Sequence, residues 1–580
     1  MIASDEQTVL DSVNTDLAWG LIERFTTLKR EHPSDVRTAA GEITSRLRDL
    51  GVPFEVLEPD LYLSLPGTAK VEHGDSSFRA KPMAMSRPAS GLTAPLAYFP
   101  GIYAKGADDL FTRVKPPEDL EMAGKIVVTE GFGMPGKVAE VELKGGLGMI
   151  AVNPGQNPHW GICTTVWGTP DLHDLPRKPK ITVMAVNNPD GEALIAAAKR
   201  GEHATLHASL EEGWYASPIP VVTIPGTEEP EKFVLLHGHY DSWDYGIGDN
   251  AVGDGAMLEI ARVLWEHRAS LKRSVKIAWW PGHSTGRYAG STWFADHYGI
   301  DLFENCIAHV NCDSPGCRWA STFKDLSVMF EAETFVTELI RDIAGPEVIV
   351  ECERPHQAGD YSFNNIGLSG YLMLSSTMPD DLRSEKGYYA VGGCGANIAW
   401  HTEDDTIEIA DKDNLLRDIK VYLSAVRRAA NATVAPFDFA RTLEDFSRTL
   451  EERQGASGTH FSFEPARNAI SKLETALEAF KAHTATLEGA AITDARVVKA
   501  NHALRRLARL LVPVNYTRGP AFFHDPAETT PSLPDLAPAL DLPDATPEMQ
   551  GFIKTHLTRG QNRLVAALRD AALVVNEAMN

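Results

Sequence analysis

The chain has 580 residues, more than one hydrophobic core usually accommodates, so we expect two to four domains. Hydrophobic residues make up 43% and charged residues 23%, a composition typical of soluble globular proteins. The 79 acidic and 55 basic residues give a net charge of −24. This charge argues against a nucleic-acid backbone or an anionic membrane as the main partner.

The amino terminus and the cysteines indicate an intracellular protein. Residues 1–20 lack a basic segment followed by an apolar one, and no apolar run approaches the roughly 18 residues of a membrane span. The six cysteines are scattered, without a CxxC pair or the spacing of a disulfide framework. We therefore expect a cytoplasmic location.

The pattern of apolar residues changes along the first 232 residues of the chain. Residues 17–50 have helical periodicity, and short strand candidates follow at FEVLE and YLSL. From about residue 80 to 215 the chain has short β-like runs (LAYFP, KIVVTE, MIAVN, ITVMAV) separated by Gly and Pro. This pattern predicts a small mixed domain. The Pro-rich segment 216–232 is predicted to connect back to another domain.

Strands and helices alternate after residue 232. The predicted strands are KFVLLHGH (232–239), SVKIAWW (274–280), CIAHVNCD (306–313) and GYLMLSS (370–376), and the helices between them include DGAMLEIARVLWEH (254–267) and STWFADHYG. This order predicts an α/β fold with a mostly parallel sheet and helices on both faces. In such sheets ligands bind at the carboxyl ends of the strands. From Pro436 onward, long helical patterns predict a separate helical domain.

Groups that can bind a metal follow the predicted strands. His239 and Asp249 follow the first strand, Asp313 ends the third, and His401 lies in the segment AWHTEDDT. His239, Asp249 and Asp313 are workable ligands of a divalent metal, and Asp241 is placed to hold the imidazole of His239 in one tautomer. Each residue alone is better explained by a structural role, as a satisfied histidine, a turn residue or a helix cap. Four such groups at successive strand ends are not expected by chance.

These motifs carry a resemblance to a known family. The series H-x-D, D-N, N-x-D and W-H-T-x-x-D-T resembles the glutamate carboxypeptidase and transferrin receptor branch of the co-catalytic zinc aminopeptidases. FEVLEPDLYLSLPG, GKIVVTEGFGMPGKVAEVELKGGLGMIAVNPG, AGDYSFNNIGLSGYLM and PFDFARTLEDFSRTLEE extend the likeness over nearly the whole chain. The resemblance implies a metallopeptidase-like domain (1–67 and 218–435), an inserted protease-associated domain (68–217) and a helical dimerisation domain (436–580). It therefore also implies a homodimer.

The resemblance assigns roles to the metal-capable residues. His239, Asp249 and Asp313 would hold one metal, Asp249 would bridge to a second, and His401 would belong to that second metal. Asp360 would lie behind the ligands and support them. The implied cofactor is a divalent metal, zinc or else manganese or iron, with one or two ions per chain.

The stretch WWPGHSTGRYAGS (279–291) departs from the family pattern. The family has a Glu-Glu pair here, in which the first Glu is the general base and the second binds the second metal. Alignment forward from Arg273 places His283 and Ser284 on that pair, whereas alignment backward from Gly290 places Ser284 and Thr285 there. Both carboxylates are absent in either register. We take His283, Ser284 and Asp241 as the catalytic candidates.

Three functional hypotheses follow. In the first, the protein is a metal-dependent hydrolase in which His283 is the base or replaces the lost ligand. It would act through an atypical site, with one metal as the simplest case, on an amide-type C–N bond of a small, non-peptide substrate, for which an aromatic one is the candidate. A conventional amino- or dipeptidase is the alternative within this class. In the second, the fold catalyses a lyase-type elimination. In the third, the protein is a non-catalytic binding protein, like the transferrin receptor.

Two bound metals would require a carboxylate from elsewhere, such as Asp244 or Glu403.

The sequence also bears on the substrate. The helical region reads AFFHDPAETTPSLPDL where glutamate-releasing relatives use a Lys-Tyr pair, and Trp400 stands where those relatives have a tyrosine. We therefore predict that the protein is not a glutamate carboxypeptidase. Aromatic residues near the ligands could form walls for a bulky substrate, and two polar residues could face it. These candidates are Trp243, Tyr245, Trp279, Trp280, Trp400, Arg287 and His356.

Two other motifs do not support a function. The GxGxxG match at 131–136 contains Pro135 and lacks the acidic residue expected about 20 positions later, so it is a poor dinucleotide fingerprint. We interpret it as a turn that needs no ligand. Ser284 next to His283 does not form a serine-nucleophile triad, because adjacent side chains usually diverge and no G-x-S-x-G elbow is present.

Overall fold

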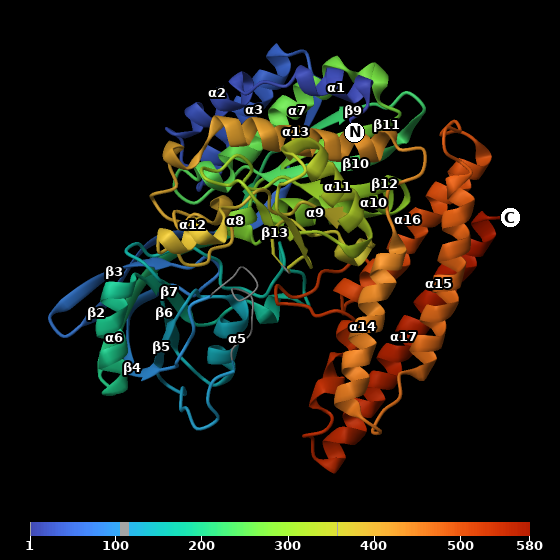
Figure 1. Cartoon of the computed structure of the whole chain (residues 1–580). Coiled ribbons are helices and arrows are strands. Elements are labelled where there is room, and N and C mark those ends of the chain that lie inside the picture. The colour runs from blue at the N-terminus through green and yellow to red at the C-terminus, as the bar shows by residue number, and fades with distance from the viewer. Residues whose placement is uncertain (1, 105–114, 357) are drawn as a thin grey trace.

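A computed structural model describes residues 2–104, 115–356 and 358–580. Figure 1 shows an α/β body at the top, a β-barrel at the lower left and a group of long helices at the right. The α/β body contains both the beginning of the chain and residues from about 217 to 435. The barrel is inserted between these two parts, and the long helices follow them.

The α/β body is built on one six-stranded sheet. In sheet order the strands are β1 (Phe54–Leu57), β9 (Ile219–Ile224), β11 (Arg273–Trp280), β10 (Glu229–His239), β12 (Cys306–Asn311) and β15 (Gly370–Tyr371). β10 lies parallel to both β11 and β12, and β15 lies parallel to β12. β9 and β1 complete the other edge in antiparallel orientation. The four strands expected after residue 232 are present, although the last has only two residues.

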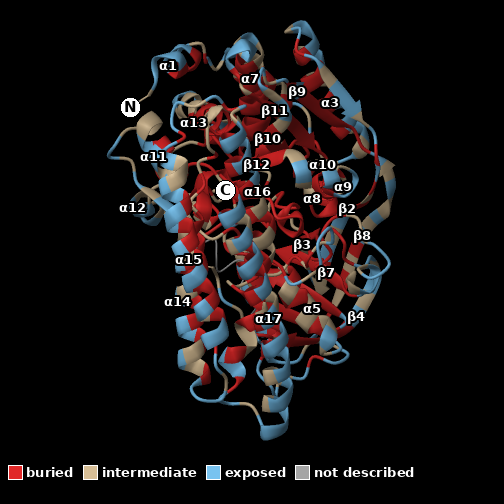
Figure 2. Cartoon of the chain, turned by 90° about the vertical axis from the view of Figure 1, so that its right-hand side faces the viewer, coloured by how far each residue is buried: buried red, intermediate tan, exposed pale blue. Residues whose placement is uncertain are grey.

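Helices cover both faces of this sheet, as predicted. Val234 and Leu236 on β10 point into one core, whereas Phe233 and Leu235 on the same strand point into the other. The first core is shared with α2 (Asp16–Phe25), α3 (Pro33–Asp49), α7 (Val252–Glu266), α11 (Glu333–Ala344) and α13 (Lys412–Asn431). The second is shared with α9 (Ala289–His297) and α10 (Gly299–Asn305). Because both faces are buried, the central strands read as continuous apolar runs rather than as an alternating pattern. Figure 2 shows this buried interior.

The segment 216–232 is more than the connection that its prolines suggested. It contains β9, which pairs with β1 on one side and with β11 on the other. Pro220 lacks an N–H group and pairs with Val56 of β1, whereas the register with β11 begins at Val221. The side chains of β9 are buried in both cores. This burial stabilises the segment as a strand despite its prolines.

The second body is a closed barrel of seven strands. In barrel order they are β2 (Asp60–His73), β3 (Ser76–Pro82), β7 (Thr182–Val186), β6 (Gly148–Val152), β5 (Ile126–Glu130), β4 (Ala89–Tyr98) and β8 (His203–Ala216). Two helices, α5 (Pro135–Leu143) and α6 (Asn188–Lys199), lie beside it. The small mixed domain predicted for residues 80–215 thus corresponds to this barrel. The predicted boundary at residue 68 falls inside β2, and the assignment as a protease-associated domain stays a prediction.

The third body consists of long helices, as predicted from Pro436 onward. They are α14 (Phe439–Ser457), α15 (Glu464–Ala485), α16 (Ala495–Tyr516) and α17 (Pro547–Ala578). Their outer faces are exposed and their inner faces are buried (Figure 2). Among the described helices, none has the length and apolarity needed to cross a membrane. Dimerisation through these helices stays a prediction.

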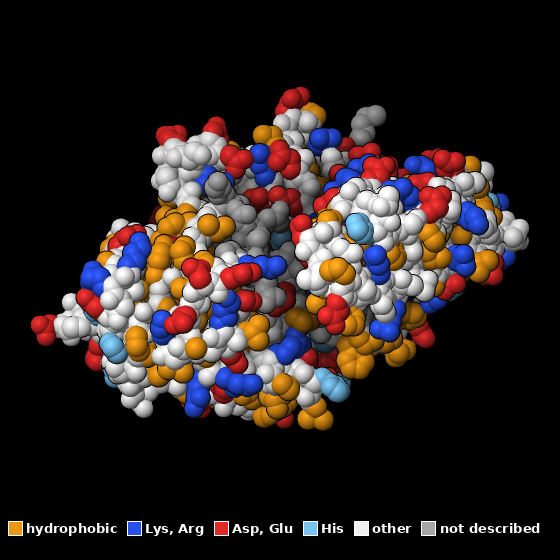
Figure 3. Space-filling view, turned by 90° about the horizontal axis from the view of Figure 1, so that it is seen from below, with side chains coloured by type: hydrophobic (Ala, Val, Ile, Leu, Met, Phe, Trp, Pro, Cys, Tyr) orange, Lys and Arg blue, Asp and Glu red, His pale blue; other side chains and the backbone are white. Residues whose placement is uncertain are grey.

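Seen from below, the barrel and the helical region form two lobes with a recess between them (Figure 3). Acidic and basic side chains intermingle on both lobes of this face.

Candidate functional site

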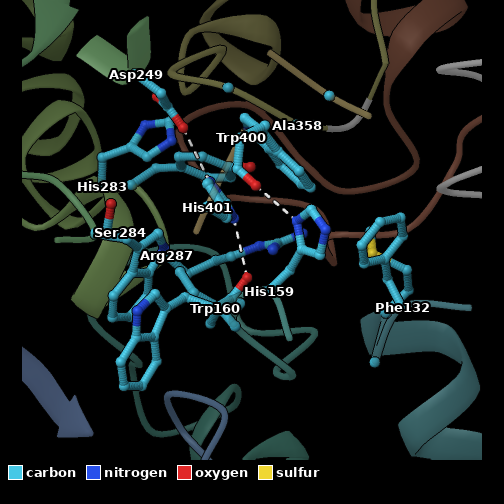
Figure 4. A pocket seen from close by; sticks show the side chains of 18 of the residues that line it. Phe132, His159, Trp160, Asp249, His283, Ser284, Arg287, Ala358, Trp400 and His401 are labelled. Carbon is cyan, nitrogen blue, oxygen red and sulfur yellow. Dashed lines mark hydrogen bonds and ion pairs between the residues drawn. The ribbon is translucent and has the colours of Figure 1, made fainter. Parts of the chain in front are cut away.

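A pocket lies at the carboxyl ends of the central strands, where the fold predicts ligand binding. Its empty volume, including the open mouth, is about 960 Å³. The predicted site residues in its wall are Trp243, Asp249, His283, Ser284, Arg287, Asp313, His356, Trp400 and His401. Figure 4 shows part of this arrangement.

Asp249 lies between two histidines. One carboxylate oxygen lies 3.0 Å from Nε2 of His239, and the other lies 3.0 Å from Nε2 of His401. Asn250 fixes the neighbouring backbone, because its amide nitrogen donates to the carbonyls of His239 (3.2 Å) and Cys312 (2.8 Å). Two segments that are distant in the sequence therefore meet at the carboxylate of Asp249.

The loop after β10 sets the tautomer of His239. Nδ1 of His239 donates to the main-chain carbonyl of Asp241 at 2.9 Å, which leaves Nε2 to face Asp249. The carboxylate of Asp241 lies 3.9 Å from the same nitrogen. This carboxylate instead accepts the backbone N–H groups of His283 (3.1 Å) and Ser284 (2.8 Å). Asp241 thus links the segment of His239 to the acid-free turn.

His283 lies directly against His239. The two imidazole rings are stacked, with centroids 3.7 Å apart and planes at 16°. Nδ1 of His283 donates to Asp360 at 2.9 Å, and the other oxygen of Asp360 accepts the hydroxyl of Ser291 at 2.7 Å. Asp360 is fully buried, so this pair fixes the imidazole and leaves Nε2 of His283 available as a ligand or a base.

Three of these groups form a possible metal site. Ligand atoms of His239, His283 and Asp313 all lie within 4.8 Å of one another. Two ligands of a tetrahedral zinc ion are roughly 3.3–3.5 Å apart, given bonds of about 2.0–2.1 Å. One ion at this set therefore requires the ligand atoms to move closer by up to about 1.4 Å and one of the two stacked imidazoles to rotate toward it. Asp313 is held by the hydroxyl of Ser314, which donates to it at 3.0 Å. In the part of the chain that the structure describes, no other group of three such residues occurs.

Asp244 and Glu403, the two carboxylates considered for a second metal ion, are engaged with basic residues. Asp244 accepts Lys29 Nζ at 2.7 Å and the indole N–H of Trp160 at 2.9 Å. Glu403 is paired with Lys81 at 2.8 Å and with Arg79 at 2.6 Å. Neither acid is part of the possible metal site.

The charges of the cluster favour a cation. Burial alone would lower the pKa of His239, but the hydrogen bond with Asp249 and the negative charge of Asp313, 3.7 Å away, raise it well above its usual value. Burial would raise the pKa of Asp249, but its hydrogen bonds with His239 and His401 hold that pKa well below the ordinary range. The cluster therefore stabilises an additional positive charge, which a metal ion would supply.

The barrel contributes residues that sequence reasoning missed. The carbonyl of Trp160 accepts Nδ1–H of His401 at 3.0 Å, and the N–H of Trp160 donates to the carbonyl of His401 at 2.9 Å. Nδ1 of His159 donates to the carbonyl of Trp400 at 2.6 Å, and its Nε2 accepts the hydroxyl of Tyr389 at 2.8 Å. Figure 4 shows two of these contacts as dashed lines. The only sequence signal was a His-Trp pair in a loop.

The pocket walls are mainly aromatic. Trp160 stacks on Trp243, with ring centroids 5.4 Å apart, and Phe132 meets Trp400 edge to face at 5.8 Å. Phe132 belongs to the GxGxxG match, so the turn that we interpreted as needing no ligand lies in the pocket wall. The other aromatic candidates lie elsewhere. Trp279 and Trp280 are fully buried in the two cores, and Tyr245 lies outside the pocket lining with Lys29 over its ring.

Comparison with known proteins places this site in a family context. Residues 221–426 match the model of Peptidase family M28. The chain is 24% identical over 338 residues to "Probable glutamate carboxypeptidase VP8" of Zea mays, covering 47% of this chain and 46% of that protein. It is 29% identical over 183 residues to "Carboxypeptidase Q" of Rattus norvegicus, covering 29% of this chain and 39% of that protein. The chain thus spans less than half the length of these curated relatives.

Solved structures share the fold. An aminopeptidase from Aneurinibacillus sp. strain AM-1 superposes with a TM-score of 0.52 at 18% identity, over 73% of this chain and 96% of that one. BSAP, a zinc aminopeptidase from Bacillus subtilis, gives a TM-score of 0.52 at 21% identity, over 72% and 96% of the two chains. At these identities the likeness concerns the fold alone.

Proposed function

We propose that the protein is a hydrolase that cleaves an amide-type C–N bond with one divalent metal ion. Residues 221–426 match the model of Peptidase family M28, which supports this proposal. The ion is zinc, or else manganese or iron, and lies between His239, His283 and Asp313. The observation that carries this proposal is the cluster of these three donors beneath an aromatic pocket. Its members come from the ends of β10, β11 and β12, where three parallel strands meet.

His283 takes the place of a carboxylate ligand in this proposal. Asp360 holds Nδ1–H of His283 at 2.9 Å, as carboxylates commonly do behind metal-bound histidines. Asp244 and Glu403 are held by lysine and arginine partners, so neither completes a second metal site. The donor set therefore supports one ion and not two.

The remaining residues provide orientation and proton transfer. When bound, the divalent ion polarises the amide carbonyl and lowers the pKa of a water molecule. Asp249 and His401, 3.0 Å apart, form a carboxylate–imidazole pair that takes the proton from the attacking water and returns it to the leaving amine. Trp160 keeps His401 in the tautomer whose Nε2 faces Asp249. The barrel thus takes part in catalysis by orienting the proton acceptor.

The pocket supports a small substrate with an aromatic or bulky apolar part. Rings of Phe132, Trp160, Trp243 and Trp400 surround the donors. The relatives are named for carboxypeptidase or aminopeptidase activity, and hydrolysis of an amide bond is the chemistry that these names share. We propose a non-peptide amide as the substrate here, because the sequence lacks the Lys-Tyr pair expected of glutamate carboxypeptidases.

Metal analysis of two histidine variants tests the proposal. The purified full-length protein should contain about one divalent ion per chain. His283→Ala should lose the ion, because it removes one of three ligands. His401→Ala should keep the ion and lose turnover, because it removes only the proton acceptor. Two tightly bound ions in the wild type, or an intact ion in His283→Ala, would contradict this site.

A substrate panel separates the remaining activities. N-acyl aromatic amides should be hydrolysed by the zinc-loaded protein, and His401→Ala is the inactive control with its metal in place. Faster cleavage of dipeptides would make the protein a conventional peptidase. An unsaturated product formed without water uptake would identify a lyase. Absence of both metal uptake and turnover would support the receptor-like alternative.

A further inference from the structure

Arg287 lies in the pocket wall and is 5% exposed. Its Nε and Nη2 atoms are buried and have no hydrogen-bond partner among the residues that the structure describes. The described carboxylates of the pocket are engaged with histidines: Asp249 with His239 and His401, and Asp313 near His239 at 3.7 Å. A buried charge without an anionic partner is unfavourable, and the described residues supply no such partner to Nε and Nη2 of Arg287, so these atoms are available for an anionic ligand.

The backbone holds Arg287 in this position. Arg287 and Tyr288 both have left-handed backbone conformations, with φ of 50° and 68°. The carbonyl of Arg287 accepts the N–H of Gly168 from the barrel segment at 2.6 Å, and its guanidinium lies 5.2 Å from the ring of Tyr288. Two successive non-glycine residues in this region are uncommon, and such strain is often found at functional sites. Figure 4 labels Arg287 near Ser284 and His283.

The unpaired edge of the guanidinium matches a carboxylate. Nε and Nη2 lie on the same side of the group and present two parallel N–H bonds, the arrangement that binds both oxygens of a planar carboxylate. We infer that Arg287 binds a carboxylate group of the substrate. The substrate class is then an amide that carries an aromatic or apolar part and a carboxylate. This inference rests on the proposed function, because it places the anion in the same pocket as the metal cluster.

A binding experiment tests this inference without turnover. The probes are N-benzoylglycine and its neutral analogue N-benzoylglycinamide, which differ only in the carboxylate. Calorimetric titrations use the full-length protein, first with its metal and then after chelation. In both states the wild type should bind N-benzoylglycine at least about tenfold more tightly than the amide.

Three variants make the result specific. Arg287→Gln should reduce the preference for N-benzoylglycine to less than about twofold, and Arg287→Lys should retain part of it. Both variants keep a β-carbon, so the backbone strain at this position is unchanged. Arg318→Gln is the charge-matched control, because Arg318 is exposed and paired with Glu408. It should bind both probes as the wild type does.

Stability provides a second measurement. Arg287→Gln should raise the melting temperature of the ligand-free protein or leave it unchanged, because it removes a buried charge that has no partner. A lower melting temperature in both Arg287 variants, or failure of both to fold, would make Arg287 a structural residue and overturn the inference. Carboxylate binding that requires the metal but not Arg287 would overturn it as well. Normal probe binding together with a lack of amide hydrolysis would count against the proposed function alone.

Discussion

Replacement of Asp360 by Asn tests whether Asp360 supports His283 as a ligand of the proposed metal ion. Asp360 is fully buried and accepts His283 Nδ1–H at 2.9 Å and the hydroxyl of Ser291 at 2.7 Å. Burial would raise the pKa of Asp360, but the neighbouring charge and hydrogen bond of His283 lower it, so the group is a carboxylate at neutral pH. Asn keeps the shape and one acceptor but removes the negative charge from the His283 imidazole.

The expected effect is a loss of metal affinity. A hydrogen bond to a charged group contributes about 1.5–3 kcal/mol, and Asn retains part of it. A loss of about 1.4–2.8 kcal/mol corresponds to roughly 10- to 100-fold weaker binding, the range typical of residues that support metal ligands. Stability without metal should change less, because Asn also removes the cost of burying a charge.

Competition with a chromophoric chelator measures zinc affinity, and chemical unfolding in the presence of chelator measures stability. Asp445→Asn is the matched control, because Asp445 is buried, accepts Ser532 Oγ at 2.7 Å and belongs to α14, outside the pocket lining. This control can lower stability but should keep zinc affinity. Equal zinc affinity in Asp360→Asn and the wild type would refute the role of Asp360 in orienting a ligand.

Two further predictions concern buried cations outside the metal cluster. Burial lowers the pKa of Lys137 to about 8. Between about pH 8 and pH 10.5 the unfolded chain therefore binds more protons than the folded one. The free energy of unfolding should rise over this range by up to about 1.4 kcal/mol per pH unit. Lys137→Met should remove this increment in unfolding curves recorded at pH 7.5, 9 and 10, and an unchanged pH dependence would contradict it. Arg30 is fully buried and donates to the carbonyls of Tyr240, Tyr245 and Gly246. Arg30→Met should lower the free energy of unfolding by about 2 kcal/mol or more, because the buried carbonyls of Tyr240 and Tyr245 lose their donor at a cost of about 1–3 kcal/mol each, whereas the carbonyl of Gly246 keeps the N–H of Ala251 at 3.1 Å. A loss below about 1 kcal/mol would show that water replaces the arginine.

Sequence patterns determined the elements of the central sheet and the positions of the metal-capable residues. β10, β11 and β12 are recognisable because strands buried on both faces are continuously apolar, and the polar residues that follow them lie at one sheet edge. The same reasoning did not predict β9, because its prolines are typical of a linker. Its pairing with β1 and β11 depends on segments about 165 and 50 residues away in the sequence.

Only the tertiary structure shows which side chains surround His283 in the turn 279–291. The sequence could not choose between two registers for His283, because its neighbours in the site, His239, Asp313 and Asp360, come from three other segments. The contact of Trp160 with His401 joins two different bodies of the protein and leaves no periodic or motif signal. Nε and Nη2 of Arg287 lack a hydrogen-bond partner among the described residues, and the sequence cannot show this because it depends on which residues pack around the guanidinium. Residue types and local periodicity specify which groups are available, whereas long-range packing fixes which of their atoms face the pocket.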